Sequence, residues 1–175
     1  MADVGAKHPE LQFLYRLVWE YRDAWLVPTD AQGLEASTFS YVEGETLGPL
    51  PGRFRGTNHG ARRTDGTFLP DAQGVILPTD GSSPLIVNFQ GFGSTYPSAE
   101  QRRVVTSVTH RTANVAFLDL NDSICIGIGE NTESPESVTL LTMDVFQAVW
   151  TQLDTNHRAR PSLPDTITIE PWFRK

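Results

Sequence analysis

The sequence predicts an all-β protein whose strands form a single antiparallel β-barrel around a central cavity. Three observations favour this class. Apolar residues recur with a period of two, Asp-Gly pairs separate short strand candidates, and no amphipathic helix of ordinary length is evident. The chain has 175 residues, enough for one domain with a buried core. We expect one domain over 1–175, with the barrel itself at about 11–150.

The clearest alternation lies near the N-terminus and consists of Phe13, Tyr15, Leu17, Trp19 and Tyr21. Successive side chains of a strand point to opposite faces, so these residues are predicted to share one face. The segment 138–150 carries apolar residues on both faces. Its β-branched start favours a strand, although a helix stays open for its last turns.

Shorter strand candidates occupy the middle of the chain at 37–43, 52–57, 68–77, 85–90, 104–109, 114–118 and 123–127. Turn signals separate them at Asp65-Gly66 and Asp80-Gly81, because glycine accepts the positive φ that a hairpin turn needs. Regularly spaced hairpins indicate a meander, and hence a barrel or a sandwich.

The C-terminal segment 156–175 differs from the rest because Pro161, Pro164 and Pro171 interrupt it. It also holds Trp172 and Phe173, which make it apolar for a free tail. We therefore expect this extension to pack on or near the barrel, with a disordered tail as the alternative.

Composition excludes several classes of protein. The net charge of -7 argues against nucleic acid or an anionic membrane as the main partner and favours a soluble monomer or small oligomer, for which a homodimer is the form considered. Neither a secretory signal nor an apolar run of about 18 residues is found, so a cytoplasmic location is expected. Cys125 is the only cysteine, which rules out an intramolecular disulfide, and its apolar neighbours predict an inert thiol in the core.

A set of turn and strand motifs recurs in a fixed order along the chain. Gly48-Pro49, Asp65-Gly66, Asp71 and Asp80-Gly81 come first, and the segments 117–121, 126–129 and 138–149 follow. Over about 11–149 this pattern resembles the family called domain of unknown function 3237. The resemblance implies a lipocalin-like (calycin-type) β-barrel with a small-molecule pocket. Small barrels of this general kind also occur in natural-product pathways as cofactor-free cyclases, isomerases or lyases.

Four polar residues are candidates for catalysis. His59 could move a proton near neutral pH, although a surface histidine is an equal alternative. Asp71 begins a strand, and an inward carboxylate there would act as a base or an acceptor, whereas an outward one would cap a turn. Asp119 and Asn121 would share a face and clamp a carbonyl or hydroxyl if that stretch is extended. An ordinary polar loop is the favoured alternative for these two residues.

The remaining candidates would bind the substrate, and they are Trp19, Tyr21, Arg53, Arg55, Asn58, Phe89 and Tyr96. Aromatic stripes of β proteins more often belong to the core than to a ligand wall, and paired arginines on a strand are more often exposed. The loop 92–101 is long for a hairpin and could cover the barrel mouth. Arg62-Arg63 and Arg102-Arg103 are interpreted as solvated loop charges.

No strong catalytic motif, phosphate-binding loop or spacing of metal ligands is found, so neither a cofactor nor a metal is predicted. The leading hypothesis is a cofactor-independent enzyme that binds a small apolar metabolite. It would catalyse a cyclisation, isomerisation or elimination, with a Diels-Alder-type pericyclic cyclisation as the sharpest form. A lipocalin-like carrier without turnover is the alternative. A filled barrel that serves only protein interaction is the third reading.

Overall fold

The computed structural model describes residues 9–28, 35–65, 67–95, 101–133 and 139–149. Over these ranges the chain forms strands and one short 3-10 helix. They are β1 (Glu10–Pro28), β2 (Glu35–Leu47), β3 (Gly52–Asn58), β4 (Ala61–Arg63), β5 (Phe68–Leu69), β6 (Asp71–Pro78), β7 (Leu85–Thr95), β8 (Gln101–Thr112), η1 (Val115–Asp122), β9 (Cys125–Glu133) and β10 (Thr139–Val149).

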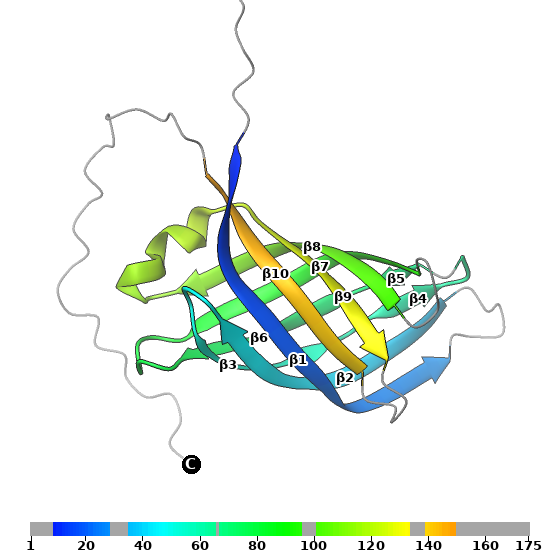
Figure 1. Cartoon of the computed structure of the whole chain (residues 1–175). Coiled ribbons are helices and arrows are strands. Elements are labelled where there is room, and N and C mark those ends of the chain that lie inside the picture. Colours follow the sequence, from blue (N-terminus) through cyan, green and yellow to red (C-terminus); the bar gives the residue numbers. More distant parts are fainter. Residues whose placement is uncertain (1–8, 29–34, 66, 96–100, 134–138, 150–175) are drawn as a thin grey trace, which may run out of the picture.

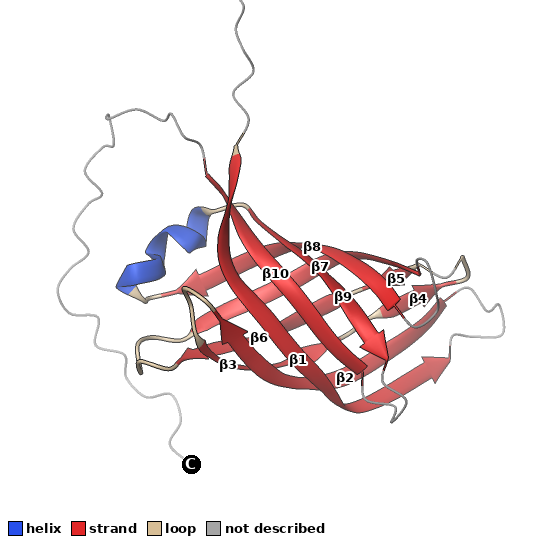
Figure 2. Ribbon diagram, viewed as in Figure 1, coloured by secondary structure: helices blue, strands red, loops and turns tan. Residues whose placement is uncertain are grey.

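The strands close into an eight-stranded antiparallel β-barrel, which confirms the predicted fold class (Figure 1). The ring of neighbours runs β1-β10-β9-β8-β7-β6-β3-β2 and returns to β1. At one end of the barrel, β4 and β5 also connect β2 to β7. The wall between β2 and β7 is thus formed by two strand pairs, β3 with β6 and β4 with β5. Figure 2 shows η1 at the opposite end of the barrel from β4 and β5.

The interior is filled by side chains that alternate along the strands. Tyr15, Leu17 and Trp19 of β1 are all buried, as the predicted alternation requires. The Trp19 indole stacks on Phe54 of β3 with the ring centroids 5.2 Å apart, and Phe89 of β7 meets both rings edge-on. These aromatic side chains join three strands across the barrel and make its centre a packed core.

Phe13 departs from this alternation. A register shift in the pairing of β1 with β10 falls between Phe13 and Tyr15. The extra residue of this bulge reverses the phase of the strand, so Leu14 is buried while Phe13 is 40% exposed. The predicted shared face therefore holds from Tyr15 onward, and its extension to Phe13 is wrong.

The predicted strand at 114–118 is also wrong, because this segment begins η1. The Asn114 side chain accepts a hydrogen bond from the backbone N–H of Ala116 at 3.1 Å and so caps the helix N-terminus. Leu120 is the buried side chain of the helix and anchors it to the end of the barrel. At 138–150 the strand prediction is confirmed by β10, whose Leu141, Met143 and Val145 are buried.

The predicted turn at Asp80-Gly81 is present between β6 and β7. Gly81 has a φ of 75°, and Asp80 Oδ1 accepts a hydrogen bond from the Ser82 backbone N–H at 2.9 Å. A residue with a Cβ atom would be strained at this φ, which explains the glycine. The C-terminal segment 156–175 lies outside the described residues, as do Tyr96 and most of the expected mouth loop.

Candidate functional site

A cavity of about 440 Å³ opens at the end of the barrel that carries β4 and β5. Ala24, Leu26, Ala36 and Phe68 supply much of its apolar wall. Polar side chains also line it, namely Tyr21, Thr38, Ser40, Asn58, Arg62, Arg102 and Asn131. Its volume falls in the range of about 300–1,000 Å³ typical of small-molecule sites. The expected cavity is therefore present, but it lies at the mouth, and the centre of the barrel is packed. We call it the mouth cavity.

A second β-bulge in β1 shapes the mouth cavity. Tyr21 pairs with Val42 of β2 and Ala24 pairs with Ser40, so two residues of β1 lie opposite the single residue Tyr41. Because of this extra residue, Tyr21 and Ala24 both face the interior although they are three positions apart. Tyr21 thus faces inward as the continuation of the series of Tyr15, Leu17 and Trp19, and the bulge brings Ala24 to the same face beyond it.

Two buried amides hold this hydroxyl. Asn58 Nδ2 donates to the Tyr21 oxygen at 3.4 Å, and the Tyr21 hydroxyl donates to Asn131 Oδ1 at 3.5 Å. Asn58 Oδ1 accepts a hydrogen bond from the Asp71 backbone N–H at 3.3 Å. This contact fixes the amide of Asn58 so that its NH2 group is directed at Tyr21. The contacts to Tyr21 are at the long end of the hydrogen-bond range. Protein partners therefore orient the hydroxyl on both its donor and its acceptor side.

Burial raises the pKa of Tyr21 above its ordinary value. The nearby indole N–H of Trp19, which lacks a well-aligned partner, and the amides of Asn58 and Asn131 oppose this rise, as does the positive charge of Arg102. Because the net shift is upward, the Tyr21 hydroxyl keeps its proton at neutral pH. Its single O–H donates to Asn131, so it can donate to an oxygen atom of a ligand in the mouth cavity by exchanging this 3.5 Å contact for one with the ligand.

Tyr21, Phe68 and Asn131 form the floor of the mouth cavity. The same three residues also border a void of about 10 Å³ deeper in the barrel, beside Trp19 and Phe89. Trp19 and Phe89 are thus core residues beneath the floor. Of the predicted substrate-binding residues, Tyr21 and Asn58 line the mouth cavity, while Trp19 and Phe89 support it from below.

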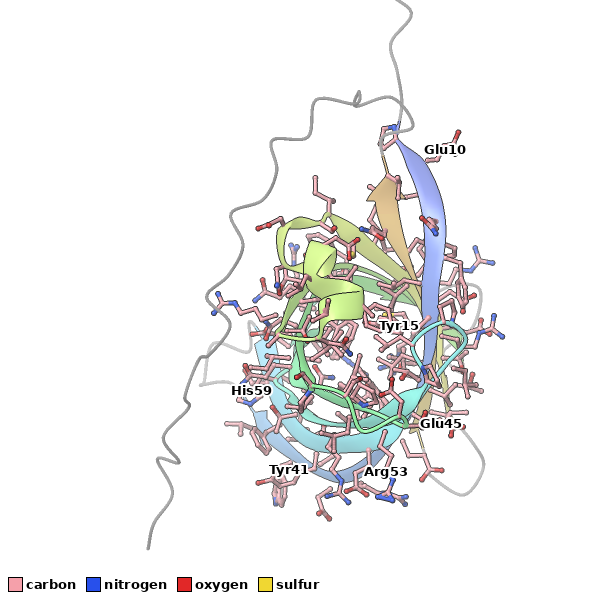
Figure 3. The ribbon with its side chains drawn as sticks, turned by 90° about the vertical axis from the view of Figure 1, so that its left-hand side faces the viewer. Glu10, Tyr15, Tyr41, Glu45, Arg53 and His59 are labelled. Carbon is pink, nitrogen blue, oxygen red and sulfur yellow. The ribbon has the colours of Figure 1, made fainter. Side chains whose placement is uncertain are left out.

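His59 and Asp71 lie on the outer surface of the barrel. His59 is exposed and packs against Phe39 with the ring centroids 4.7 Å apart, and Figure 3 shows it outside the wall. The Asp71 carboxylate is exposed and accepts a hydrogen bond from Gln90 Nε2 at 3.1 Å, while the next residue, Ala72, points inward. The alternation of the strands therefore directs both candidate catalytic groups away from the mouth cavity.

Asp119 and Asn121 lie in η1, at the opposite end of the barrel. Since this stretch is helical, the two side chains do not share one face of a strand. Asp119 accepts a hydrogen bond from Gln147 Nε2 at 2.9 Å. Asn121 binds both the backbone N–H and the carbonyl of Thr112, at 2.8 and 3.0 Å. Both residues fix the helix to the barrel, as the loop alternative implied.

Arg53 and Arg55 are exposed on the outer face of β3, on either side of the buried Phe54. Arg55 forms an ion pair with Glu43 at 3.3 Å, and Figure 3 shows Arg53 pointing away from the barrel. The exposed alternative therefore describes both arginines. Tyr96, the last predicted substrate-binding residue, lies outside the described residues.

The predicted site residues did not include five polar residues that line the mouth cavity: Thr38, Ser40, Arg62, Arg102 and Asn131. Asn131 continues the inward series of Cys125 and Gly127 along β9, a period-two signal that could have identified it. Arg62 and Arg102 were interpreted as solvated charges. The bend between β3 and β4 decides the direction of Arg62, and such a bend has no clear signature in the sequence.

A second buried polar pair lies nearer to η1. The Tyr15 hydroxyl and His110 Nε2 are 2.9 Å apart, and Figure 3 shows Tyr15 directed into the barrel. Burial lowers the pKa of His110 to about 4 and raises that of the adjacent Cys125 thiol to about 11. Within the described ranges, no group of three or more His, Cys, Asp or Glu side chains is arranged to hold a metal ion. Those ranges also contain no helix with the length and apolar character needed to span a bilayer.

Comparison with known proteins identifies the fold. No family model matches the chain, and no curated protein matches it. A conserved protein of unknown function from Rhodopseudomonas palustris superposes with a TM-score of 0.69 at 13% identity, covering 81% of this chain and 98% of the other. A β-barrel-like protein from Acinetobacter baumannii gives a TM-score of 0.63 at 13% identity, with 78% and 95% covered.

An enzyme from Penicillium herquei gives a TM-score of 0.58 at 19% identity, covering 81% of this chain and 95% of that enzyme. At these identities the likeness establishes the barrel fold alone. Barrels of this shape are thus found both in a protein that is an enzyme and in proteins whose function is unknown. The resemblance to the domain of unknown function 3237 family stays a prediction.

Proposed function

We propose that this protein is a cofactor-independent enzyme of small-molecule metabolism. It binds a largely apolar substrate in the mouth cavity and catalyses a cyclisation, isomerisation or elimination. One observation carries the proposal: a protonated phenol, oriented by two buried amides, lies at the floor of an apolar cavity of about 440 Å³. An apolar cavity with a few convergent polar groups is the usual form of a small-molecule site.

The reaction classes follow from what these groups can do. The Tyr21 hydroxyl donates a hydrogen bond to a carbonyl oxygen of the substrate and stabilises the negative charge that develops there during reaction. The apolar wall excludes water and holds the reactive part of the substrate in one conformer. Cyclisations, isomerisations and eliminations next to a carbonyl need only such polarisation and positioning, and they need no protein nucleophile. A pericyclic cyclisation of the Diels-Alder type is accelerated in the same way.

The direct test is turnover. Wild-type protein is incubated with a panel of apolar carbonyl compounds, including polyenes and quinone methides, and the products are followed by chiral liquid chromatography with mass detection. Loss of a single preorganised donor typically costs about 10²–10³ in rate, so we expect Tyr21→Phe to slow conversion by about that factor while binding persists. Tyr41→Phe removes a hydroxyl from the exposed outer face and is the matched control.

A carrier protein of lipocalin type is the second candidate function. The apolar wall around the floor favours it, because binding without turnover requires only burial of the ligand. The two functions give different results in the same experiment. If a ligand binds but every compound tested is converted no faster than in buffer alone, the carrier function is established and the enzyme proposal is removed.

A further inference from the structure

We propose that the mouth cavity selects ligands whose carbonyl group lies at or near one end of an apolar skeleton, and that Phe68 is the residue that sets this preference. This inference rests on the proposed function and names the substrate class of the same site. It arises from the floor of the mouth cavity, where the hydroxyl that binds an oxygen atom and a firmly packed aromatic ring lie together.

The floor leaves little room below the Tyr21 hydroxyl. The mouth cavity has a volume of about 440 Å³, whereas the void beneath the floor has only about 10 Å³. This void is near the smallest size that holds one water molecule. Trp19 and Phe89 border it and are themselves buried in the core. A ligand whose oxygen atom reaches Tyr21 can therefore extend towards the opening of the barrel, but it cannot extend deeper.

Phe68 is the apolar residue of the floor, and its position is fixed by close contact with the wall. It belongs to β5, lines both the mouth cavity and the void, and is 9% exposed. A Cβ atom added at Gly60 would overlap with Cε2 and Cζ of the Phe68 ring, and one at Gly93 would lie 3.4 Å from its Cβ. The ring thus packs directly on the backbone at Gly60, which leaves it little freedom to move outward.

These two features sort ligands by the position of their carbonyl group. A ketone has two substituents on its carbonyl carbon. When its oxygen accepts a hydrogen bond from Tyr21, one substituent runs along the apolar wall to the opening and the other faces Phe68. A long substituent on that side has to displace the ring, and overpacking of this kind is unfavourable. We therefore expect aldehydes and methyl ketones to bind in preference to compounds with the carbonyl in mid-skeleton.

The test uses three ketones of the same formula. Because 2-, 4- and 6-undecanone have equal numbers of carbon atoms, the hydrophobic gain on binding is nearly the same, and differences in affinity report the carbonyl position. Each ketone is used to displace the neutral fluorescent probe N-phenyl-1-naphthylamine from the full-length protein. We expect 2-undecanone to bind most tightly and 6-undecanone at least about tenfold more weakly, which is the factor that overpacking typically costs.

Four variants assign this ranking to the floor. Phe68→Ala removes the ring and is expected to bind the three ketones with nearly equal affinity. Phe68→Leu is a smaller change that should narrow the differences even if Phe68→Ala does not fold. Phe92→Ala shortens a 67% exposed phenylalanine of β7 and is the matched control, which should keep the wild-type ranking. In Tyr21→Phe the ranking should disappear, because no hydroxyl then fixes the depth of the carbonyl.

The outcomes separate this inference from the function on which it rests. Equal affinity of the wild-type protein for the three ketones would overturn the inference and leave the mouth cavity as a site for apolar ligands. A ranking that survives in both Phe68→Ala and Phe68→Leu would overturn it as well, because another part of the cavity would then read the carbonyl position. If neither the probe nor any ketone binds, the proposed function itself is contradicted.

Discussion

The Tyr15 hydroxyl and His110 Nε2 lie 2.9 Å apart in the interior of the barrel, where both side chains are buried. Tyr15 belongs to β1 and His110 to β8, so this contact crosses the barrel between strands that are not neighbours. The His110 pKa of about 4 and the raised Tyr15 pKa mean that both groups are uncharged at neutral pH. The pair therefore links stability to pH from inside the core.

The first prediction concerns acid. The unfolded chain binds a proton at His110 with an ordinary pKa of 6.5, whereas the folded protein binds it only near 4. The contribution of neutral His110 to the free energy of unfolding is therefore fully present above pH 6.5 and is lost as the pH falls towards 4. The loss is on the order of 3 kcal/mol, at about 1.4 kcal/mol for each pH unit. Urea unfolding between pH 8 and pH 4 measures it.

The control for this pH dependence is His59, which is exposed on the outer surface. We expect His110→Leu to flatten the fall in the free energy of unfolding between pH 6.5 and pH 4, while His59→Gln keeps the wild-type slope. Equal slopes in His110→Leu and wild type would show that carboxylates alone cause the acid sensitivity.

The second prediction measures the pair itself. At pH 8, Tyr15→Phe leaves the His110 ring without its partner in the core, which we expect to cost about 1–3 kcal/mol. Combined with His110→Leu, the two substitutions should be less destabilising than the sum of the single changes, by at least about 0.5 kcal/mol. A double-mutant cycle by urea unfolding gives this coupling energy. If the two changes in the free energy of unfolding were strictly additive, the contact between Tyr15 and His110 would contribute nothing to stability.

The third prediction concerns the attachment of η1. Asn121 holds both backbone groups of Thr112, so Asn121→Ala removes two hydrogen bonds at once and is expected to cost about 1–3 kcal/mol. Asp122→Ala, at the exposed neighbouring position, is the control and should change stability by less than about 0.5 kcal/mol. Binding of the apolar fluorescent probe N-phenyl-1-naphthylamine should persist in both folded variants because the mouth cavity lies at the other end of the barrel.

The fourth prediction concerns Cys125. Its thiol is 1% exposed, and burial raises its pKa to about 11, so only about one molecule in a thousand is a thiolate at pH 8. We expect no reaction with 5,5′-dithiobis(2-nitrobenzoate) in the folded protein and one thiol per chain in urea. In the double variant Cys125→Ser/Ile124→Cys the thiol moves to an exposed position and should react at once. Fast labelling of native wild-type protein would contradict the burial.

The sequence predicted the barrel well because alternation and turn chemistry are local properties. The run from Tyr15 to Trp19 and the Asp80-Gly81 turn depend on neighbouring residues alone. The exceptions arise where the phase of a strand changes. At Phe13 a β-bulge directs the side chain outward. At 114–118 the helix η1, capped by Asn114, forms where a strand was expected. Neither change alters the hydrophobic pattern enough to be recognised in advance.

The site was harder to predict for the same reason. Tyr21 and Asn58, two of the predicted substrate-binding residues, line the mouth cavity because each belongs to an alternating strand. His59 follows Asn58 directly, and a shift of one residue is enough to put its side chain on the outside. Arg62 lines the mouth cavity because the chain bends between β3 and β4. Which polar group faces inward thus depends on bends and bulges, whose positions are fixed by packing across the barrel.

The two strand pairs between β2 and β7 differ in length, and this difference has a mechanical consequence. Near η1 the gap between β2 and β7 is closed by β3 and β6, with seven and eight residues, whereas at the mouth it is closed by β4 and β5, with three and two. So few ladder bonds make this seam the weakest part of the wall, and we expect its amides to exchange with deuterium before those of β3 and β6. We therefore expect any local opening of the wall to begin at this seam, while the longer ladder of β3 and β6 stays paired.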